Sequence, residues 1–277
     1  MSIRETCYNC NSKSNVFYYT ENGFHLHQCK SCELIFVINP PNEENILNAH
    51  QQGLHRGKDK DLVVSQVFQE GKANYLYSIL NEMFNKNEIK GKKWIDIGSG
   101  TGELLLALKQ FTNNNIDLIG SEPNTLKRNI ANAKNLQTSY IDIDNCNLKF
   151  NFISILNVYS HLYDPVKFLK KLNNLLLPNG EIFIETSDTV KYSAKDHYKP
   201  FHLPDHLSFA SEKIIRGIFL RNGYEFVSIK KTPLVKGGLI KLIKETIKYI
   251  IPNYESQLIK FVKYRKTDIF LRFRKIK

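Results

Sequence analysis

Two pairs of cysteines near the start of the chain could together bind one metal ion. The pairs have CxxC spacing and are separated by 18 residues: Cys7 and Cys10, then Cys29 and Cys32. A CxxC segment turns tightly, so its two thiolates can hold one side of a tetrahedral Zn²⁺ ion, and the doubled spacing is typical of a zinc ribbon. We expect structural zinc, because so short a segment buries too little apolar surface to fold without it. A catalytic or redox role for the thiols is the alternative.

A second candidate site is a glycine-rich turn between a predicted strand and a predicted helix. Glycines let the backbone approach a ligand closely, and the helix N-terminus that follows favours an anionic group. Glu122 ends the next predicted strand, 24 residues after Gly98, where its carboxylate could accept hydrogen bonds from both hydroxyls of a ribose. In this context the turn predicts a nucleoside cofactor. Its candidate residues are Asp96, Gly98, Ser99, Gly100, Thr101 and Gly102.

The residues around the turn favour S-adenosylmethionine (SAM) among the nucleotide cofactors. Glu103 stands where a dinucleotide fingerprint has its third glycine, and a carboxylate there would repel a pyrophosphate. No Gly-Lys-Ser/Thr follows, which excludes a Walker A loop. SAM has no phosphate and is cationic, so Asp96 could orient its methionine end and Asp142 could meet its adenine amino group, with Asp144 as the alternative. The predicted cofactor set also contains Glu122, Pro123 and Asn157.

Several segments resemble the motifs of class I SAM-dependent methyltransferases. DIGSGTG at residues 96–102, together with Glu122, is similar to motifs I and II of that family. Later segments that resemble the family are VYSHLYDP at 158–165, PNGE at 178–181, HLSF at 206–209 and RNGY at 221–224. The resemblance covers about residues 7–230 and implies a Rossmann-like α/β fold that binds SAM.

Cysteine pairs before such a domain are similar to a subgroup with an N-terminal zinc-binding module. Many members of that subgroup modify sugars, polysaccharides or small metabolites in bacteria. The chain departs from the pattern at Ser160, where the family has glutamate, and at Asn179, where it has glycine. The long C-terminal domain of the subgroup's sugar C-methyltransferases is also missing. That difference favours O- or N-methylation.

Methyl transfer to a hydroxyl needs a base, and two histidines are placed to supply one. His161 follows the fourth predicted strand and His206 lies after the fifth, so both fall at the carboxyl edge of the expected parallel sheet, where ligands bind. An imidazole titrates near neutral pH and is suited to general base catalysis. Structural roles are the alternative: His161 could cap the next helix, and His206 could fix its loop.

Strand and helix patterns alternate from residue 92 onward, which predicts a parallel sheet covered by helices. We expect a zinc ribbon at 1–40, a helical linker at 41–90, and the SAM-binding domain at 91–277 with a basic helical insertion at about 233–266. Strands are predicted at 94–98, 116–121, 139–143, 152–158, 181–185, 224–230 and 268–275. Helices are predicted at 103–111, 165–177 and 211–221.

The charge of the chain is concentrated near its C-terminus. The net charge is +12, and residues 231–277 carry +10 of it. A basic segment could contact lipid headgroups or nucleic acid, or could simply be solvated. With no apolar leader in the first residues and no run of eighteen apolar residues, we expect a cytoplasmic protein, with peripheral contact at the inner membrane face through this segment.

These features predict a SAM-dependent methyltransferase that acts on a sugar, a glycan precursor or another small metabolite. The first alternative is an RNA methyltransferase that grips RNA with its zinc ribbon. The basic segment favours it, but no Asn-Pro-Pro-Tyr motif follows the fourth strand. The second alternative is a non-catalytic interaction protein that keeps the fold, which the intact glycine turn disfavours.

Overall fold

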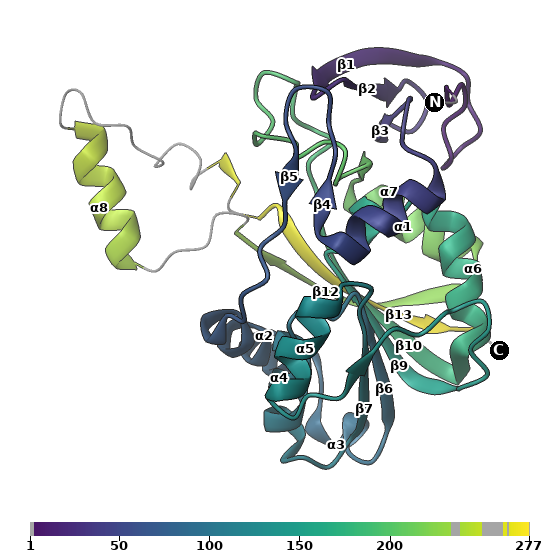
Figure 1. The fold of residues 1–277 in the computed structure, drawn as a ribbon, viewed down its shortest axis with the longest axis vertical. Coiled ribbons are helices and arrows are strands. Elements are labelled where there is room, and N and C mark those ends of the chain that lie inside the picture. The colour runs from purple at the N-terminus through teal and green to yellow at the C-terminus, as the bar shows by residue number, and fades with distance from the viewer. Residues whose placement is uncertain (1–2, 234–238, 251–262, 265, 277) are drawn as a thin grey trace.

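The computed structural model describes residues 3–233, 239–250, 263–264 and 266–276. A seven-stranded sheet forms its centre, and helices cover both faces (Figure 1). The strand order is β12-β13-β10-β9-β6-β7-β8, in which β13 runs antiparallel to its neighbours β10 and β12. The strands are β6 (Lys93–Ile97), β7 (Asp117–Ser121), β8 (Thr138–Ser139), β9 (Phe150–Leu156), β10 (Leu176–Ser187), β12 (Tyr224–Thr232) and β13 (Asp268–Lys275). The predicted Rossmann-like α/β fold is confirmed.

The central strands are buried on both faces because successive side chains point to opposite sides. On one side Ile95 and Ile153 join the larger apolar cluster with residues of α6 (Pro165–Leu175) and α7 (Glu212–Arg221). On the other side Trp94 and Phe152 stack with ring centroids 4.8 Å apart. They pack there beneath α2 (Glu70–Met83) and α4 (Glu103–Thr112). Helices α3 (Lys86–Ile89) and α5 (Thr125–Ala133) also border this sheet in the sequence.

A second sheet joins the N-terminal segment to the main domain. Its order is β1 (Asn15–Glu21), β2 (Phe24–Cys29), β3 (Ile35–Val37) and β11 (Ser208–Phe209). The fourth strand, β11, comes from the loop region after β10. The stretch predicted as a helical linker contains α1 (Glu43–Gln52), α2 and α3, and also a short hairpin of β4 (Leu54–His55) and β5 (Leu62–Val63).

The turn at residues 178–180 is part of β10 instead of a separate loop. Helix α6 ends at Leu175, and β10 begins at the next residue. Pairing of β10 with β9 shifts register between Leu176 and Glu181, so the turn residues form an irregularity in the strand.

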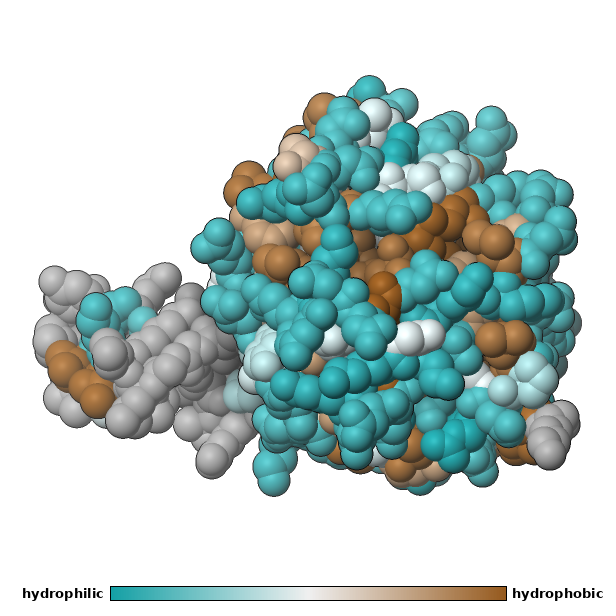
Figure 2. Space-filling model, turned by 90° about the horizontal axis from the view of Figure 1, so that it is seen from below, coloured by the Kyte–Doolittle hydropathy of each residue, from teal (hydrophilic) through white to brown (hydrophobic). Residues whose placement is uncertain are grey.

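The predicted basic insertion at 233–266 is only partly described. Helix α8 (Leu239–Ile250) lies within it, and residues 234–238, 251–262 and 265 lie outside the described residues. Figure 2 shows brown apolar side chains on this outlying helix, where Ile243 and Ile247 are each about half exposed. Among the described residues, no helix is long and apolar enough to cross a membrane.

Candidate functional site

A cavity of about 410 Å³ opens where β6, β7 and β9 end. The chain builds β6, β7 and β8 in one direction and then returns to place β9 on the other side of β6. Such a reversal leaves a crevice at the carboxyl edge of the sheet, where ligands bind in open α/β folds. Seven of the predicted site residues line the cavity: Gly98, Glu122, Pro123, Asp142, Asn157 and His161, with Asp144 as the alternative to Asp142.

The glycine turn needs its glycines for backbone geometry. Gly98, Gly100 and Gly102 all have positive φ, at 72°, 57° and 96°, a conformation that costs little only for glycine. A Cβ on Gly98 would lie 2.5 Å from Val158 Cγ2. Gly102 is the N-cap of α4, so the free amides of the helix start point toward the turn.

The turn is tied to the next strand by the carboxylate of Glu122. Glu122 is 5% exposed, and its two oxygens accept hydrogen bonds from Gly100 N and Asn124 N, each at 2.9 Å. These bonds hold the carboxylate at the cavity wall, where its remaining lone pairs can accept ribose hydroxyls.

Asp96 lies beneath the turn and does not line the cavity. It is 3% exposed, and Ser154 Oγ donates to its Oδ1 at 2.6 Å. Burial raises the pKa of Asp96 to about 7, despite the hydrogen bond from Ser154, which lowers it. A carboxyl group poised near neutrality gains charge when a cation binds beside it.

The other members of the glycine turn also face the protein. Ser99, Thr101 and Glu103 are buried, and Glu103 accepts hydrogen bonds from Thr101 Oγ1 at 2.6 Å and Gln69 N at 3.1 Å. Glu103 therefore stabilises the first turn of α4 through these hydrogen bonds. Its carboxylate does not line the cavity in which we expected it to repel a pyrophosphate.

Asp142 and Asp144 follow β8 and both line the cavity. Asp142 accepts hydrogen bonds from Asp144 N at 3.1 Å and Asn145 Nδ2 at 2.5 Å. Asp144 instead pairs with Lys171 at 2.6 Å. The ion pair leaves Asp142 as the better placed acceptor for an adenine amino group.

Asn157 directly follows β9 and has a left-handed conformation, with φ of 55°. Its Nδ2 donates to Glu185 Oε2 at 2.7 Å, and its backbone N donates to Glu185 O at 3.1 Å. These bonds fix the loop that leads into the short helix η1 (Tyr159–His161).

His161 is held by Asp205, a residue that we did not predict from the sequence. His161 Nδ1 lies 2.8 Å from Asp205 Oδ1 and 2.9 Å from Asp205 O. Burial lowers the pKa of His161, but the Asp205 carboxylate outweighs burial and raises it overall. The pair has the arrangement of a histidine base oriented by a carboxylate.

His206 occupies a different position. Its Nδ1 lies 3.0 Å from Phe201 O, its ring centroid lies 4.8 Å from that of His161, and it does not line the cavity. Burial, with repulsion from His161, lowers the pKa of His206 to about 3. This environment favours the structural alternative for His206 over the base role that we predicted.

His50 and His55 also line the cavity, although no sequence motif pointed to them. His50 lies in the last turn of α1 and His55 in β4. Burial lowers the pKa of His50 to about 3 and also lowers that of His55. The two come from a region without a recognisable motif, and only the fold places them beside Asp205.

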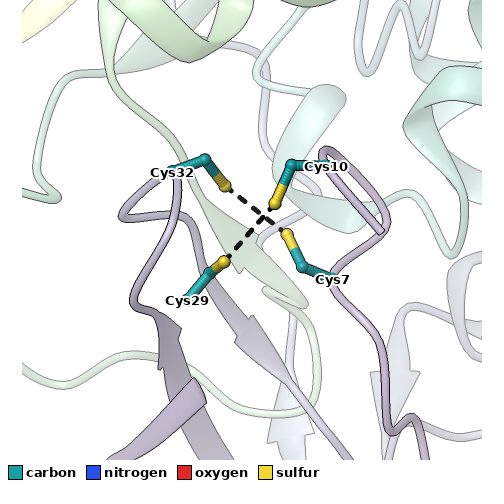
Figure 3. Close-up of side chains that lie close together, drawn as sticks. All are labelled: Cys7, Cys10, Cys29 and Cys32. Carbon is teal, nitrogen blue, oxygen red and sulfur yellow. Dashed lines mark hydrogen bonds between the residues drawn. The ribbon is translucent and has the colours of Figure 1, made fainter. Parts of the chain in front are cut away.

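The four predicted metal ligands meet in one cluster (Figure 3). Cys7 Sγ lies 3.5 Å from Cys32 Sγ, and Cys10 Sγ lies 3.5 Å from Cys29 Sγ. Four thiolates around one Zn²⁺ at 2.3 Å would be separated by about 3.8 Å. The hydrogen bond between the two thiols lowers the pKa of Cys32 and raises that of Cys7. The donor set fits a tetrahedral zinc ion.

This four-cysteine cluster is connected to the cavity by short contacts. Tyr8 Oη, within the first CxxC motif, lies 3.1 Å from Tyr159 Oη, two residues before His161. Leu207 N donates to Ser160 O at 2.6 Å, beside the strand that pairs with β3. The N-terminal sheet therefore supports the loop that carries His161.

Residues 68–229 match a protein family described as "Methyltransferase domain". Solved structures share the fold. Coclaurine N-methyltransferase bound to N-methylheliamine and SAH gives a TM-score of 0.53 with 12% identity, covering 85% of this chain and 82% of that chain. A SAM-dependent methyltransferase from Mesorhizobium loti gives 0.51 with 12% identity, covering 73% and 98%.

Curated relatives share a single name, tRNA U34 carboxymethyltransferase. The protein of that name from Campylobacter lari is 32% identical over 110 residues, 36% of each chain. Its counterpart from Campylobacter fetus is 28% identical over 161 residues, covering 52% of this chain and 56% of the relative. The chain thus spans between about a third and a little over half of the length of these relatives.

These relatives correct our prediction of the acceptor. We expected a sugar, a glycan precursor or another small metabolite, and a place in polysaccharide biosynthesis, whereas the relatives are named for an activity on tRNA. That prediction was wrong because it came from a subgroup resemblance in the N-terminal module.

Proposed function

Since this chain belongs to the methyltransferase domain family, we propose that it transfers a methyl group from SAM to a nucleoside of RNA, with tRNA as the favoured substrate. The observation that carries the choice of acceptor is the shared name of its curated relatives, tRNA U34 carboxymethyltransferase, while methyl transfer is supported by the family match. A single-stranded tRNA loop presents unstacked bases, which an enzyme can draw into a cavity at little cost.

The residues around the cavity suit an RNA acceptor. Lys127, Lys167 and Lys171 line it and can contact phosphates, while Tyr140 and Tyr163 supply aromatic faces for a base. Stacking and phosphate contacts together provide most of the affinity for single-stranded nucleic acid. Lys171 already pairs with Asp144, so Lys127 and Lys167 are the better candidates for phosphate contact.

SAM would be held at the carboxyl edge of the sheet by the glycine turn and its partners. When bound, it supplies an electrophilic methyl group. Glu122 would accept the ribose hydroxyls, Asp142 the adenine amino group, and Asp96 would orient the methionine end from beneath Gly98. The protein's main contribution is then to exclude water and align the acceptor with the methyl group.

We infer that His161 is the catalytic base and Asp205 its positioning residue. Its Nδ1 is occupied by Asp205, and among the described residues its Nε2 makes no hydrogen bond. Because His161 lines the cavity, Nε2 can accept a proton from a hydroxyl or ring nitrogen of the acceptor.

The four-cysteine cluster would hold a structural zinc ion. The sulfur spacing suits tetrahedral zinc. The N-terminal zinc-binding segment would both support the loop that carries His161 and bind RNA. The described contacts between Tyr8 and Tyr159 favour the first of these roles most directly.

The basic segment 231–277 would contact the RNA backbone. Part of its charge is already used within the protein, since Arg272 and Arg274 pair with Glu181. Three of its lysines are also in ion pairs: Lys231 with Glu212, Lys248 with Glu245 and Lys263 with Asp196. The remaining lysines could bind the phosphates of RNA or of lipid headgroups, so binding to RNA and binding to lipid vesicles are both measured. Binding to RNA should weaken steeply with salt, and vesicles containing anionic lipid should compete poorly.

The test incubates the protein and SAM labelled in its methyl group with total tRNA and, separately, with sugar nucleotides and a lipid-linked glycan fraction. We expect label in tRNA, released as one modified nucleoside after nuclease digestion, and no transfer by Glu122→Ala. Transfer to the sugar or glycan fraction with none to RNA would overturn the proposal. Asp117→Ala, which removes an exposed carboxylate at the far end of β7, is the matched control and should leave transfer intact.

A further inference from the structure

A histidine–aspartate cluster lies in the wall of the cavity, apart from the residues of the glycine turn. It consists of His50, His55 and Asp205, whose nearest nitrogen and oxygen atoms all lie within 4.8 Å of one another. The three residues come from α1, from β4 and from the loop before β11. Only the folded chain brings them together, and all three line the cavity.

The approach of His55 to Asp205 is not a hydrogen bond. His55 Nε2 lies 3.2 Å from Asp205 Oδ1, yet among the described residues this buried nitrogen has no hydrogen-bond partner. His55 is only 3% exposed, so water cannot readily satisfy it. Two ligands of one metal ion also lie close together without a hydrogen bond between them.

His50 completes the group from the side of α1. Its ring centroid lies 4.9 Å from that of His55 and 5.6 Å from that of His161, in both cases edge to face. Among the described residues, its ring nitrogens make no hydrogen bond. A partly buried imidazole without a partner has a nitrogen lone pair available for a ligand, and His50 lines the cavity.

We propose that His50, His55 and Asp205 bind a divalent first-row transition-metal ion. Two imidazoles and one carboxylate are ligands that such ions accept, with open positions left for water or substrate. Bonds of 2.0–2.2 Å place neighbouring ligands roughly 3–3.6 Å apart, so small side-chain rotations bring atoms within 4.8 Å into one coordination sphere.

His161 supports this site instead of competing with it. Its Nδ1 donates to the Asp205 oxygen at 2.8 Å, and a hydrogen bond to a ligating carboxylate orients that ligand. The open positions would face the cavity and take an oxygen atom of the acceptor. This role rests on the proposed function, whereas the binding of the ion does not.

The test uses the full-length protein reconstituted with Co²⁺ and freed of excess ion by gel filtration. We expect the wild type to hold one more ion per chain than His50→Ala or Asp205→Asn. The additional Co²⁺ should give weak visible bands without the strong near-ultraviolet band of cobalt–thiolate bonds. That spectrum separates it from an ion in the four-cysteine cluster.

His202→Ala is the matched control, because His202 is exposed and belongs to the same loop as Asp205 but not to the cluster. Loss of a ligand should weaken Co²⁺ binding by more than the roughly 10–100-fold that loss of an outer partner costs. Co²⁺ should raise the Tm of the wild type and of His202→Ala by more than it raises the Tm of the two ligand variants, which keep only the ion of the four-cysteine cluster. Equal metal content in all four proteins would overturn the proposal. This readout needs no RNA, so it is independent of the proposed acceptor.

Discussion

The buried carboxyl group of Asp96 should make SAM binding depend on pH in the neutral range. The pKa of Asp96 is raised to about 7 by burial, so the group is largely protonated in the free protein at pH 6. A cationic ligand beside it favours the carboxylate, and binding therefore releases a proton. The affinity for SAM is therefore highest above pH 7 and decreases as the pH falls through 7.

The expected size follows from the same shift. If the carboxylate stays ionised in the complex, SAM should bind roughly 30-fold more weakly at pH 5.5 than at pH 8, a loss of about 2 kcal/mol. Isothermal titration in two buffers of different ionisation enthalpy would count the protons released. Asp96→Asn should bind SAM weakly and show no pH dependence in this window.

Burial of Asp96 should have the opposite effect on the free energy of unfolding, which should fall as the pH rises. The folded protein keeps its proton on Asp96 up to about pH 7, whereas an unfolded aspartate loses it near 3.9, so this group lowers stability between these values by up to about 4 kcal/mol. Asp96→Asn should therefore be at least as stable as the wild type at pH 8 while binding SAM poorly. Asp117→Asn, an exposed counterpart, is the control. A flat affinity profile in the wild type, or an unchanged slope in Asp96→Asn, would refute the reasoning.

Four further results are expected. Gly98→Ala should lose SAM affinity, because alanine in this left-handed conformation costs ~1–2 kcal/mol and its Cβ would clash with Val158 Cγ2. Adding Val158→Ala to this variant should restore only part of the affinity, because it removes the clash alone. A SAM titration curve for Gly98→Ala that matches the wild type would contradict this. Glu181→Ala leaves the buried Arg272 without its main partner and should cost about 3–5 kcal/mol in urea unfolding; a loss under about 1 kcal/mol would show that the pair is dispensable. His161→Ala should lower kcat by roughly 10²–10⁴ with SAM affinity retained, and a fully active variant would remove His161 from the mechanism. A strong chelator should abolish hydrogen-exchange protection in β1–β3, and full protection would mean that apolar packing alone holds them.

The main domain could be predicted from the sequence because its signals are local. Each central strand is a short apolar run, and the glycine turn sits between such a run and an amphipathic helix. The predicted strand at 139–143 is in fact only Thr138–Ser139, because edge-strand length depends on pairing and not on composition. The turn at 178–180 misled us for the same reason: pairing with β9 extends β10 through residues that usually end an element.

The candidate site was predicted only in part, and the missing residues share one cause. Asp205 lies 44 residues from its partner His161, and His50 and His55 belong to a different sheet and helix. No periodicity or motif connects positions so far apart in the chain. Asp96 was identified by motif, but its elevated pKa comes from burial that the sequence does not reveal.

The pairing of β3 with β11 also bears on the order in which the protein assembles. Ile35 and Phe36 pair with Phe209 and Ser208, and most of the methyltransferase domain lies between them in the sequence. During synthesis at roughly 5–20 residues per second, the cysteines emerge early and can capture zinc long before their sheet receives its last strand. A contact of such long sequence separation forms slowly. The edge of β3 is therefore exposed on the nascent chain until the downstream loop arrives, and that interval is when a chaperone would be most useful.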